Sequence, residues 1–438
     1  MAIQPTQQNQ PTRRRFLRSM LAAGTAPLFV PIHVLRGATA PSNQITLGIL
    51  GAGAQGRWDM QAFLGHEDVR VTAICDVNQK NIRIAQDKIT EAYGRVDVRV
   101  FSDFRKLNAD PSIDAILMAL PVHWHSITAQ DAILNKKHIY HEKPMAMSVE
   151  EGQRVRRAVR QKGVVFQFGT QQRSSVYFRW ASELALNGRL GKMKRIEVCV
   201  PGGHRESSIF EPQSVPAYLD WDRWIGPAPE MFFHEKIITR EFHEYISNFS
   251  LGFISCWGIH HLDIAQWGNG SDHTGPSSVE GTGEYPVRGT CNALYKWKVH
   301  FEFAHATPVT FASPGYDIAH GVRFIGESGW VHCSRGSIKA HDDKLLKDAQ
   351  NKCGSMPIKL PVSESHTRNF IDAIKNGTPT LSDVETAMHS DILCQIALIA
   401  VQEGRKLQWD PKTEQFIDDD TANRRLKQRP FRGDWKLS

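Results

Sequence analysis

A glycine-rich turn between a strand and a helix is the feature that most constrains the fold of this chain. The apolar run Ile45–Leu50 predicts a buried strand. It is followed by G-x-G-x-x-G at Gly51, Gly53 and Gly56 and then by a helical pattern. A second apolar strand ends at Asp76, 20 residues after Gly56. This order of a strand, glycines, a helix and an acidic residue predicts a dinucleotide-binding βαβ unit.

Each position of this fingerprint has a physical task. Gly51 permits a tight turn, Gly53 lets the backbone approach a pyrophosphate, and Gly56 lets the helix pack against the strand. Asp76 would accept hydrogen bonds from the adenosine ribose and repel a 2′-phosphate, so NAD is expected rather than NADP. The helix N-terminus offers unpaired N–H groups to the phosphates. The first helical residues, also expected to contact the cofactor, are Ala54 and Gln55.

Strand and helix patterns continue to alternate after this unit. Further strands are expected at 115–120, 138–140 and 164–168, with helices at 126–135 and 149–162. The alternation predicts a doubly wound parallel sheet, in which ligands bind at the carboxyl ends of the strands. The residues expected at those ends are Pro121, His123, Trp124, His125, Glu142 and Lys143. Of these, Pro121, His125, Glu142 and Lys143 are expected to contact the cofactor.

The first 40 residues differ in composition from the rest of the chain. They hold five arginines and no acidic residue, and so carry five of the seven net positive charges. TRRRFLR, a weak apolar segment and the small residues GATA are typical of a twin-arginine export signal, which predicts a periplasmic or exported protein. A disordered basic tail is the alternative. The apolar segment is interrupted by Arg18, Gly24, Pro27 and Pro31, so no membrane anchor is expected.

The length and composition are those of an ordinary globular protein with two domains. Of 438 residues, 41% are hydrophobic and 23% are charged. We expect a signal peptide at 1–40, a Rossmann domain at 41–165 and a second domain at 166–438. The small net charge of the body argues against nucleic-acid binding. Seven cysteines without CxxC or zinc-type spacing predict no disulfide framework, and their odd number leaves at least one free thiol per chain.

Several segments resemble the Gfo/Idh/MocA family of oxidoreductases. They are the glycine fingerprint, LPVHWHSITAQDAILNKKHIYHEKP and CWGIHHLDIAQW. GTQQRS, DWDRWIGPAP, WDPKTEQF and RPFRGDWKL resemble an exported subgroup of that family. The resemblance implies an N-terminal Rossmann domain and a C-terminal α/β domain with a large, open, mostly antiparallel sheet. It also implies a carbohydrate substrate between that sheet and the nicotinamide, and a homo-oligomer formed through the sheet.

The resemblance assigns the central catalytic role to Lys143 of the Glu-Lys-Pro motif, which would contact both the cofactor and the reacting hydroxyl. An ammonium group can stabilise an alkoxide as charge develops. The family's Asp-x-x-x-His element aligns with Cys256 and His260, so both are expected to be catalytic residues, with the histidine retained and the carboxylate replaced by a thiol. A neutral thiol is a poor replacement. The nearby residues that could compensate are Glu241, His243, Glu244 and His261.

Polar residues after the Rossmann part are further candidates for substrate binding. Amide and guanidinium groups suit sugar hydroxyls, although ordinary loop polarity is the alternative for the segment 171–173. The predicted substrate contacts are Lys143, Gln171, Arg173, His260 and His261. Three aromatic residues could stack on a sugar or pack in the interior: Tyr218, Trp221 and Trp224.

The leading hypothesis is an exported oxidoreductase with firmly bound NAD that acts on a sugar, cyclitol or glycoside. Folded export allows the cofactor to be loaded first. Two alternatives stay open: an NAD-dependent glycosidase or lyase that acts through a transient keto-sugar, and a non-catalytic binding protein, which the loss of the carboxylate at Cys256 would fit. No metal is expected, although His260 could form a metal site with His125, His234 or His243.

Overall fold

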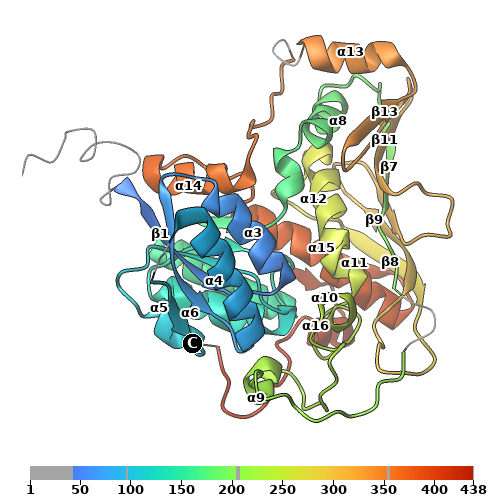
Figure 1. Cartoon of the computed structure of the whole chain (residues 1–438). Helices are drawn as coiled ribbons and strands as arrows, with labels where there is room; N and C mark the ends of the chain where they lie inside the picture. Colours follow the sequence, from blue (N-terminus) through green and yellow to red (C-terminus); the bar gives the residue numbers. More distant parts are fainter. Residues whose placement is uncertain (1–42, 95–96, 204–207, 353–355, 438) are drawn as a thin grey trace, which may run out of the picture. The chain divides into compact units, whose positions relative to one another are not determined.

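Two sheets of different topology organise the part of the chain that the structure describes (Figure 1). The structure, a computed structural model, describes residues 43–437 apart from 95–96, 204–207 and 353–355. The predicted leader at 1–40 therefore lies outside the described residues. From Ile45 onward the chain forms one unit.

The first sheet has six parallel strands in the order β3-β2-β1-β4-β5-β6. The strands are β1 (Ile45–Leu50), β2 (Val69–Cys75), β3 (Arg99–Phe101), β4 (Ala115–Met118), β5 (His138–His141) and β6 (Phe166–Phe168). The helices between them are α3 (Ala54–Leu64), α4 (Gln79–Tyr93), α5 (Phe104–Asn108), α6 (His125–Leu134) and α7 (Val149–Lys162). The predicted doubly wound sheet is confirmed, and β6 extends it just beyond residue 165. The strand order reverses between β1 and β4, which is where such sheets bind ligands.

Helix α7 illustrates how the sequence sets the bounds of an element. Ser148 caps its N-terminus by accepting a hydrogen bond from the Glu151 N–H (3.3 Å). Gly163, with φ of +65°, ends it in the left-handed conformation that glycine adopts without strain. Between them, Val155 and Val159 are buried in the hydrophobic core, where α7 packs with α6 and α15. The predicted helix 149–162 is therefore found with the same bounds.

The second sheet has nine strands in the order β13-β12-β11-β7-β10-β9-β8-β14-β15, and only the β7/β10 pair is parallel. Its strands are β7 (Met193–Cys199), β8 (Ser278–Glu284), β9 (Lys296–Glu302), β10 (Val309–Ala312), β11 (Gly321–Gly326), β12 (Trp330–Ser334), β13 (Ser337–Ala340), β14 (Leu407–Asp410) and β15 (Gln415–Phe416). In β9 the buried residues Trp297, Val299 and Phe301 alternate with more exposed polar ones. The open, mostly antiparallel sheet implied by the family resemblance is confirmed.

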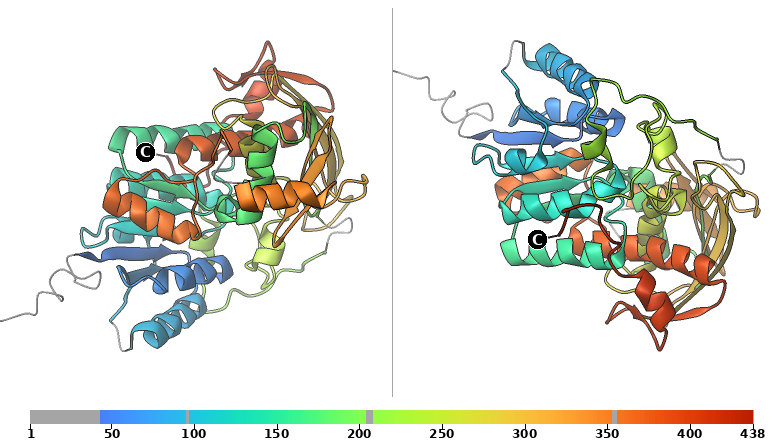
Figure 2. Two further views of the ribbon diagram at one scale, coloured as in Figure 1. Left: turned by 90° about the horizontal axis from the view of Figure 1, so that it is seen from above. Right: turned by 90° about the horizontal axis from the view of Figure 1, so that it is seen from below.

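Helices cover the buried face of this second sheet. Helix α15 contacts both β6 of the first sheet and β8 of the second, so it lies between the sheets (Figure 2). The helices of the second half are α8 (Val176–Leu186), α9 (Trp221–Ile225), α10 (Arg240–His243), α11 (Phe253–Cys256), α12 (Gly258–Asn269), α13 (Asp343–Lys352), α14 (His366–Asn376), α15 (Val384–Glu403) and α16 (Asp420–Arg425). Two short 3-10 turns are Val122–Trp124 and Gln171–Ser174.

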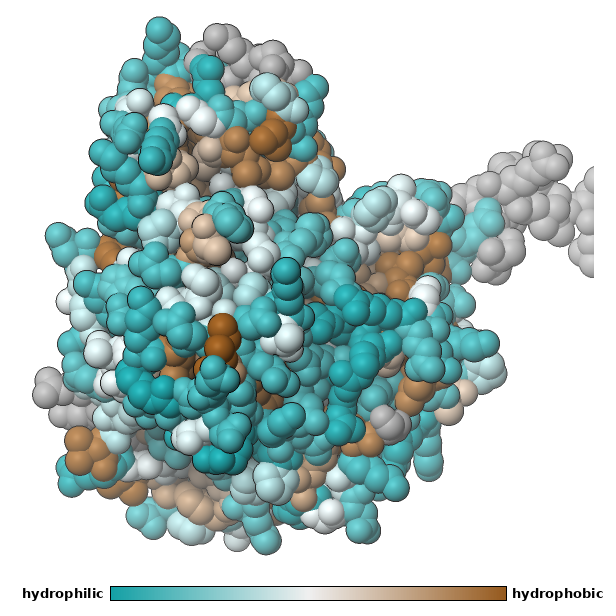
Figure 3. All heavy atoms as spheres, turned by 180° about the vertical axis from the view of Figure 1, so that it is seen from behind, coloured by the Kyte–Doolittle hydropathy of each residue, from teal (hydrophilic) through white to brown (hydrophobic). Residues whose placement is uncertain are grey.

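Helix α15 is long and apolar enough to span a membrane, but its environment is the protein interior. Of its most hydrophobic window, 78% is buried inside the protein. On the face opposite to that of Figure 1, hydrophilic side chains predominate and apolar ones lie in separate patches (Figure 3). Among the cysteines that the structure describes, six are buried: Cys75, Cys199, Cys256, Cys291, Cys333 and Cys394.

A buried ion-pair network joins the turn after β6 to α12. Arg173 donates to Asp263 (Nε to Oδ2, 2.8 Å) and to Asp272 (Nη2 to Oδ1, 2.8 Å). Ser390 of α15 donates to the other oxygen of Asp263 (2.8 Å). The side chain of Arg173 is only 3% exposed. The predicted substrate contact at Arg173 therefore needs correction, because its guanidinium is occupied by two carboxylates in the interior.

We predict that Arg173→Met lowers the free energy of unfolding by about 3–5 kcal/mol, because it leaves Asp263 as a buried, unpaired charge. Arg195→Met is the control, since Arg195 forms a 2.9 Å pair with Glu197 while 53% of its side chain is exposed. That change should cost less than about 1 kcal/mol. Urea unfolding followed by circular dichroism measures both, and equal losses would contradict the account.

Candidate active site

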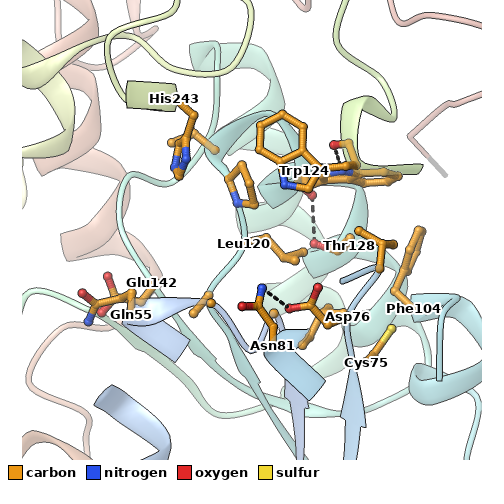
Figure 4. Close-up of a pocket in the computed structure, with 18 of the residues that line it drawn as sticks. Gln55, Cys75, Asp76, Asn81, Phe104, Leu120, Trp124, Thr128, Glu142 and His243 are labelled. Atoms are coloured by element: carbon orange, nitrogen blue, oxygen red, sulfur yellow. Dashed lines mark hydrogen bonds between the residues drawn. The ribbon is translucent and has the colours of Figure 1, made fainter. Parts of the chain in front are cut away.

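A cleft opens at the carboxyl ends of the parallel strands (Figure 4). It holds about 1180 Å³ of empty space, part of it open to solvent. Figure 4 shows Asp76 and Phe104 on one side and Glu142 with His243 on the other. The lining residues that the sequence assigned to a cofactor are Gly51, Gly53, Ala54, Gln55, Asp76, Pro121, Glu142 and Lys143.

The glycine turn leaves space for a phosphate. Gly51 has φ of +91°, and a Cβ added there would lie 2.4 Å from the Ala119 carbonyl oxygen. A Cβ on Gly56 would lie 1.9 Å from the Gly51 carbonyl oxygen. By contrast, a Cβ on Gly53 would meet no atom of the described residues within 4 Å. Helix α3 begins after Gly53 without a side-chain cap, so its first N–H groups are available to an anion.

Asp76, which follows β2, is hydrogen-bonded to the glycine turn. Its Oδ2 accepts a hydrogen bond from the Ala52 N–H and its Oδ1 accepts one from the Asn78 N–H, both at 2.8 Å. Burial raises the pKa of Asp76, while these hydrogen bonds act in the opposite direction. A carboxylate offers about four acceptor positions, so lone pairs remain for ribose hydroxyls. The turn and Asp76 together fit a dinucleotide.

The C-terminal tail forms one wall of this cleft. The ring of Trp435 lies 4.8 Å from that of Trp124, edge to face, and 6.2 Å from that of Phe104. Arg432 holds the tail in place by donating to the carbonyl oxygens of Gly226 (3.0 Å) and Asp222 (2.9 Å). In the sequence, the tail segment RPFRGDWKL indicates only the family resemblance, and no local pattern predicts its place in the site.

Lys143 lies at the other end of the cleft and is 7% exposed. Its Nζ donates to the Cys256 carbonyl oxygen (3.1 Å) and lies 3.9 Å from Glu244 Oε1. Directly after Lys143-Pro144, the Met145 N–H donates to Asp391 Oδ1 of α15 (3.1 Å). Of the residues that could replace the missing carboxylate, Glu244 is therefore the one in contact with Lys143.

The thiol of Cys256 has a different environment from the one its alignment suggested. Its Sγ lies 3.1 Å from the Ser250 hydroxyl, and it packs with Val122 and Met147. Burial, followed by the charge of Glu244, raises the pKa of Cys256 to about 12, so the thiol is neutral. The catalytic role expected for Cys256 needs correction, because its contact with Lys143 is made by the backbone carbonyl.

The two adjacent histidines of α12 have separate environments. His260 is 3% exposed, and among the described residues its Nδ1 has no hydrogen-bond partner. Burial and the charge of Lys143 lower its pKa well below the ordinary value, so the ring is neutral. His261 instead places Nδ1 3.1 Å from the Cys199 carbonyl oxygen of β7 and packs on Phe178. His261 is a core residue, which corrects its expected substrate contact.

His125 holds two strand ends together. Its Nδ1 lies 2.6 Å from the Pro144 carbonyl oxygen and its Nε2 lies 2.8 Å from that of Leu120. Burial lowers its pKa to about 4, so the neutral ring donates to only one of them. His125 does not line the cleft, which corrects its expected cofactor contact. The described residues contain no group of three His, Cys, Asp or Glu side chains that could hold a metal.

Other polar groups around Lys143 come from distant segments. Arg240 donates to Gln55 Oε1 (Nη1, 2.5 Å) and to Glu244 Oε1 (Nε, 3.2 Å). The i, i+4 spacing of Arg240 and Glu244 is a signal that the sequence did contain. Among the buried side-chain atoms without a partner in the described residues, Glu142 Oε1 and His243 Nδ1 belong to residues that line the cleft, and Gln171 Oε1 lies outside that lining. The packing expected for Trp221 and Trp224 is found, with their rings stacked at 4.9 Å.

Two family models match the chain. Residues 45–170 match the NAD-binding Rossmann fold of the oxidoreductase family GFO_IDH_MocA, and residues 203–437 match the C-terminal alpha/beta domain of the same family. The chain belongs to the Gfo/Idh/MocA family. Its two matched domains are those of an oxidoreductase family, and the first of them is an NAD-binding Rossmann fold.

Individual relatives align with parts of this Gfo/Idh/MocA protein. An uncharacterized oxidoreductase, YrbE of Bacillus subtilis, is 33% identical over 150 residues, which are 34% of this chain and 42% of that protein. Glycosyl hydrolase family 109 protein 2 of Shewanella sp. (strain ANA-3) is 32% identical over 134 residues, which are 30% of this chain and 29% of that protein. The alignments thus span less than half of either relative.

Solved structures share the fold. The WlbA dehydrogenase from Bordetella pertussis, in complex with NADH and UDP-GlcNAcA, superposes with a TM-score of 0.61 at 17% identity. The match covers 84% of this chain and 98% of that one. GenD2 from gentamicin A biosynthesis, in complex with NAD, gives a TM-score of 0.61 at 15% identity, over 84% of this chain and 97% of that one. At such identities the likeness concerns the fold alone.

We predict a pH-dependent effect of Asp391→Asn. Burial raises the pKa of Asp391 from 3.8 to about 7. The folded protein therefore binds the Asp391 proton more tightly than the unfolded chain does. The free energy of unfolding that this proton contributes is fully present below about pH 4 and is lost as the pH rises to about 7. Relative to wild type, the variant should therefore gain about 3 kcal/mol of unfolding free energy between pH 5 and pH 8. Urea titrations at both pH values measure this, and a constant difference would contradict it.

Proposed function

We propose that this Gfo/Idh/MocA protein is an exported oxidoreductase that transfers hydride between firmly held NAD and a hydroxyl of a sugar, cyclitol or glycoside. The observation that carries the proposal is the cleft that runs from Asp76 and the glycine turn to a buried lysine, Lys143, with a carboxylate and a neutral histidine beside it. The residues that would hold NAD are Gly51, Gly53, Ala54, Gln55 and Asp76. NAD is proposed over NADP because a 2′-phosphate would meet the Asp76 carboxylate.

The chain's own residues suit proton and charge transfer at a hydroxyl. When bound, NAD supplies the hydride acceptor for an alcohol and the hydride donor for a ketone. Lys143 would stabilise the alkoxide that forms when the hydroxyl loses its proton. Glu244 Oε1 lies 3.9 Å from Lys143 Nζ, so a carboxylate is the ion-pair partner of the lysine. His260, neutral and with a free Nδ1, would accept the proton.

A polyhydroxylated substrate is proposed from the groups that remain unpartnered. Among the described residues, Gln171 Oε1 and His243 Nδ1 are buried without a hydrogen-bond partner, and of the two residues His243 lines the cleft. Because buried polar atoms are normally paired, both atoms are proposed to bond to substrate hydroxyls. Trp257, which follows Cys256 and is half-buried, offers an aromatic surface on which a sugar ring can pack.

A second candidate is a glycosidase or lyase. It is favoured by the relatives named as glycosyl hydrolase family 109 proteins. Oxidation of a sugar hydroxyl to a ketone acidifies the adjacent C–H, and loss of that proton can expel the glycosidic oxygen. The same lysine and histidine would serve both reactions. An aglycone with free sugar would identify elimination, whereas a ketone or lactone would identify net oxidation.

We also propose that the protein is exported and that its copies associate with one another. The twin-arginine pattern at 1–40 supports delivery of the folded, NAD-loaded protein to the periplasm. Copies are proposed to associate through the outer face of the second sheet, as the family resemblance implies. That face carries polar residues such as Lys298, His300 and Arg323, so the interface would be polar.

We predict that Lys143→Met lowers turnover by about 10²- to 10⁴-fold, because the alkoxide loses its stabilising charge. Lys80→Met is the control, since Lys80 only stacks on the ring of Tyr218, at 3.8 Å, and does not line the cleft. Chromatography of products from a panel of glycosides and free sugars measures the loss and separates oxidation from elimination. Turnover by Lys143→Met above about one tenth of the wild-type rate would refute the role of the lysine.

We predict that the purified mature protein carries about one NAD per chain and no NADP, and that Trp435→Ala loses NAD on dialysis about tenfold faster, because the aromatic wall is removed. Trp330→Ala is the control, since Trp330 lies on β12 and stacks with Arg323 (4.3 Å) away from the cleft. Quantifying the nucleotide released on denaturation measures both variants. Wild-type protein that releases no NAD, or equal retention by both variants, would count against firm binding.

A further inference from the structure

One arginine beside the candidate active site has no acidic partner. Arg335 lies in the turn between β12 and β13, with its guanidinium over the ring of Trp257 at 4.5 Å. In the amide orientation that satisfies both neighbours, Gln172 Oε1 accepts a hydrogen bond from Arg335 Nε (3.1 Å). Among the residues that the structure describes, no carboxylate forms an ion pair with Arg335. Its Nη groups are the donors left for a ligand.

Shared neighbours place Arg335 close to the reacting groups. Trp257 follows Cys256, whose carbonyl holds Lys143, and the Trp257 ring lies 5.8 Å from that of His260. Gln172 also donates to the His260 carbonyl oxygen (2.7 Å) in the same amide orientation. Burial lowers the pKa of His260 most, followed by the positive charges of Lys143 and Arg335. The charge of Arg335 therefore acts on the His260 ring.

Arg335 is separate from the ion pairs around Lys143. Arg240 is paired with Glu244 at 3.2 Å, and the same carboxylate lies 3.9 Å from Lys143. Among the described residues, Arg335 contacts the amide of Gln172 and the ring of Trp257 and pairs with no carboxylate. Its side chain is exposed, so its Nη groups are accessible to a bound anion.

We propose that Arg335 binds a carboxylate of the substrate, so that the sugar is an acid of the uronate type. The proposal rests on the proposed function, which places the substrate beside Lys143. A guanidinium matches a carboxylate with two parallel hydrogen bonds. A phosphate monoester carries up to two negative charges and would be repelled more strongly by the nearby Glu142, so a carboxylate is the better match. Arg335 is then a specificity-determining residue.

Calorimetric binding to the NAD-loaded protein tests this assignment independently of turnover. The probes are methyl glycosides of glucuronic, galacturonic and mannuronic acid, each compared with the neutral methyl hexoside of the same configuration. Glucose 6-phosphate is included as the phosphate probe. The variants are Arg335→Gln and Arg335→Lys, and the control is Arg323→Gln, an arginine of the neighbouring β11 that stacks on Trp330. Turnover of each pair is followed in parallel.

The proposal expects at least one uronide to bind wild type about 10- to 100-fold more tightly than its neutral partner. Arg335→Gln should remove the preference for the uronide and leave the affinity for the neutral sugar unchanged. Arg335→Lys should retain part of the preference, and the control Arg323→Gln should retain all of it. Equal binding of acid and neutral sugars, tighter binding of glucose 6-phosphate, or no binding by any uronide would overturn it. A uronide preference without hydride transfer would instead sustain the role of Arg335 and refute the proposed function.

Discussion

The hydrogen bond from Lys143 Nζ to the Cys256 carbonyl oxygen connects the two halves of this protein. Lys143 follows β5 of the parallel sheet, whereas Cys256 ends α11, which packs with α12 and α15 under the second sheet. The ammonium group is buried at the junction, where Glu244 is the acidic group beside it. The cleft, the neutral histidine and the aromatic surface of Trp257 are all arranged around this one charge.

The sequence predicted the first half of the molecule well because its signals are local. A glycine with φ of +91°, a capped helix and a buried strand each depend on neighbouring residues, so Gly51, α7 and β1 were predicted with their correct positions. The carboxyl ends of parallel strands necessarily meet at one edge, which brought Asp76, Glu142 and Lys143 to one cleft.

Side-chain orientation in the second half could not be predicted in this way. Arg173 and His261 have the residue types of sugar-binding groups, yet they bind Asp263 and the Cys199 carbonyl because partners from distant elements meet them in the interior. Conversely, Arg335 and Trp435 belong to a hairpin turn and to the C-terminal tail. Their contacts with Trp257 and Trp124 depend on long-range packing that no local pattern specifies.

A carboxylate from a different segment lies beside Lys143 where position 256 offers a thiol. Glu244 follows α10, whereas Cys256 ends α11 and His260 lies on α12. A carboxylate beside Lys143 argues against a binding protein that has lost its chemistry, and membership of an oxidoreductase family agrees with this.

Hydride transfer on the protein itself is the claim that most needs a direct measurement. NAD-loaded protein would be mixed rapidly with glycosides, uronides and free sugars while the near-ultraviolet absorbance of reduced nicotinamide is recorded. The account predicts that absorbance rises with at least one substrate, and that it returns to baseline if the cycle closes by elimination or re-reduction. A protein that holds NAD and shows no absorbance change with any of these compounds would contradict it.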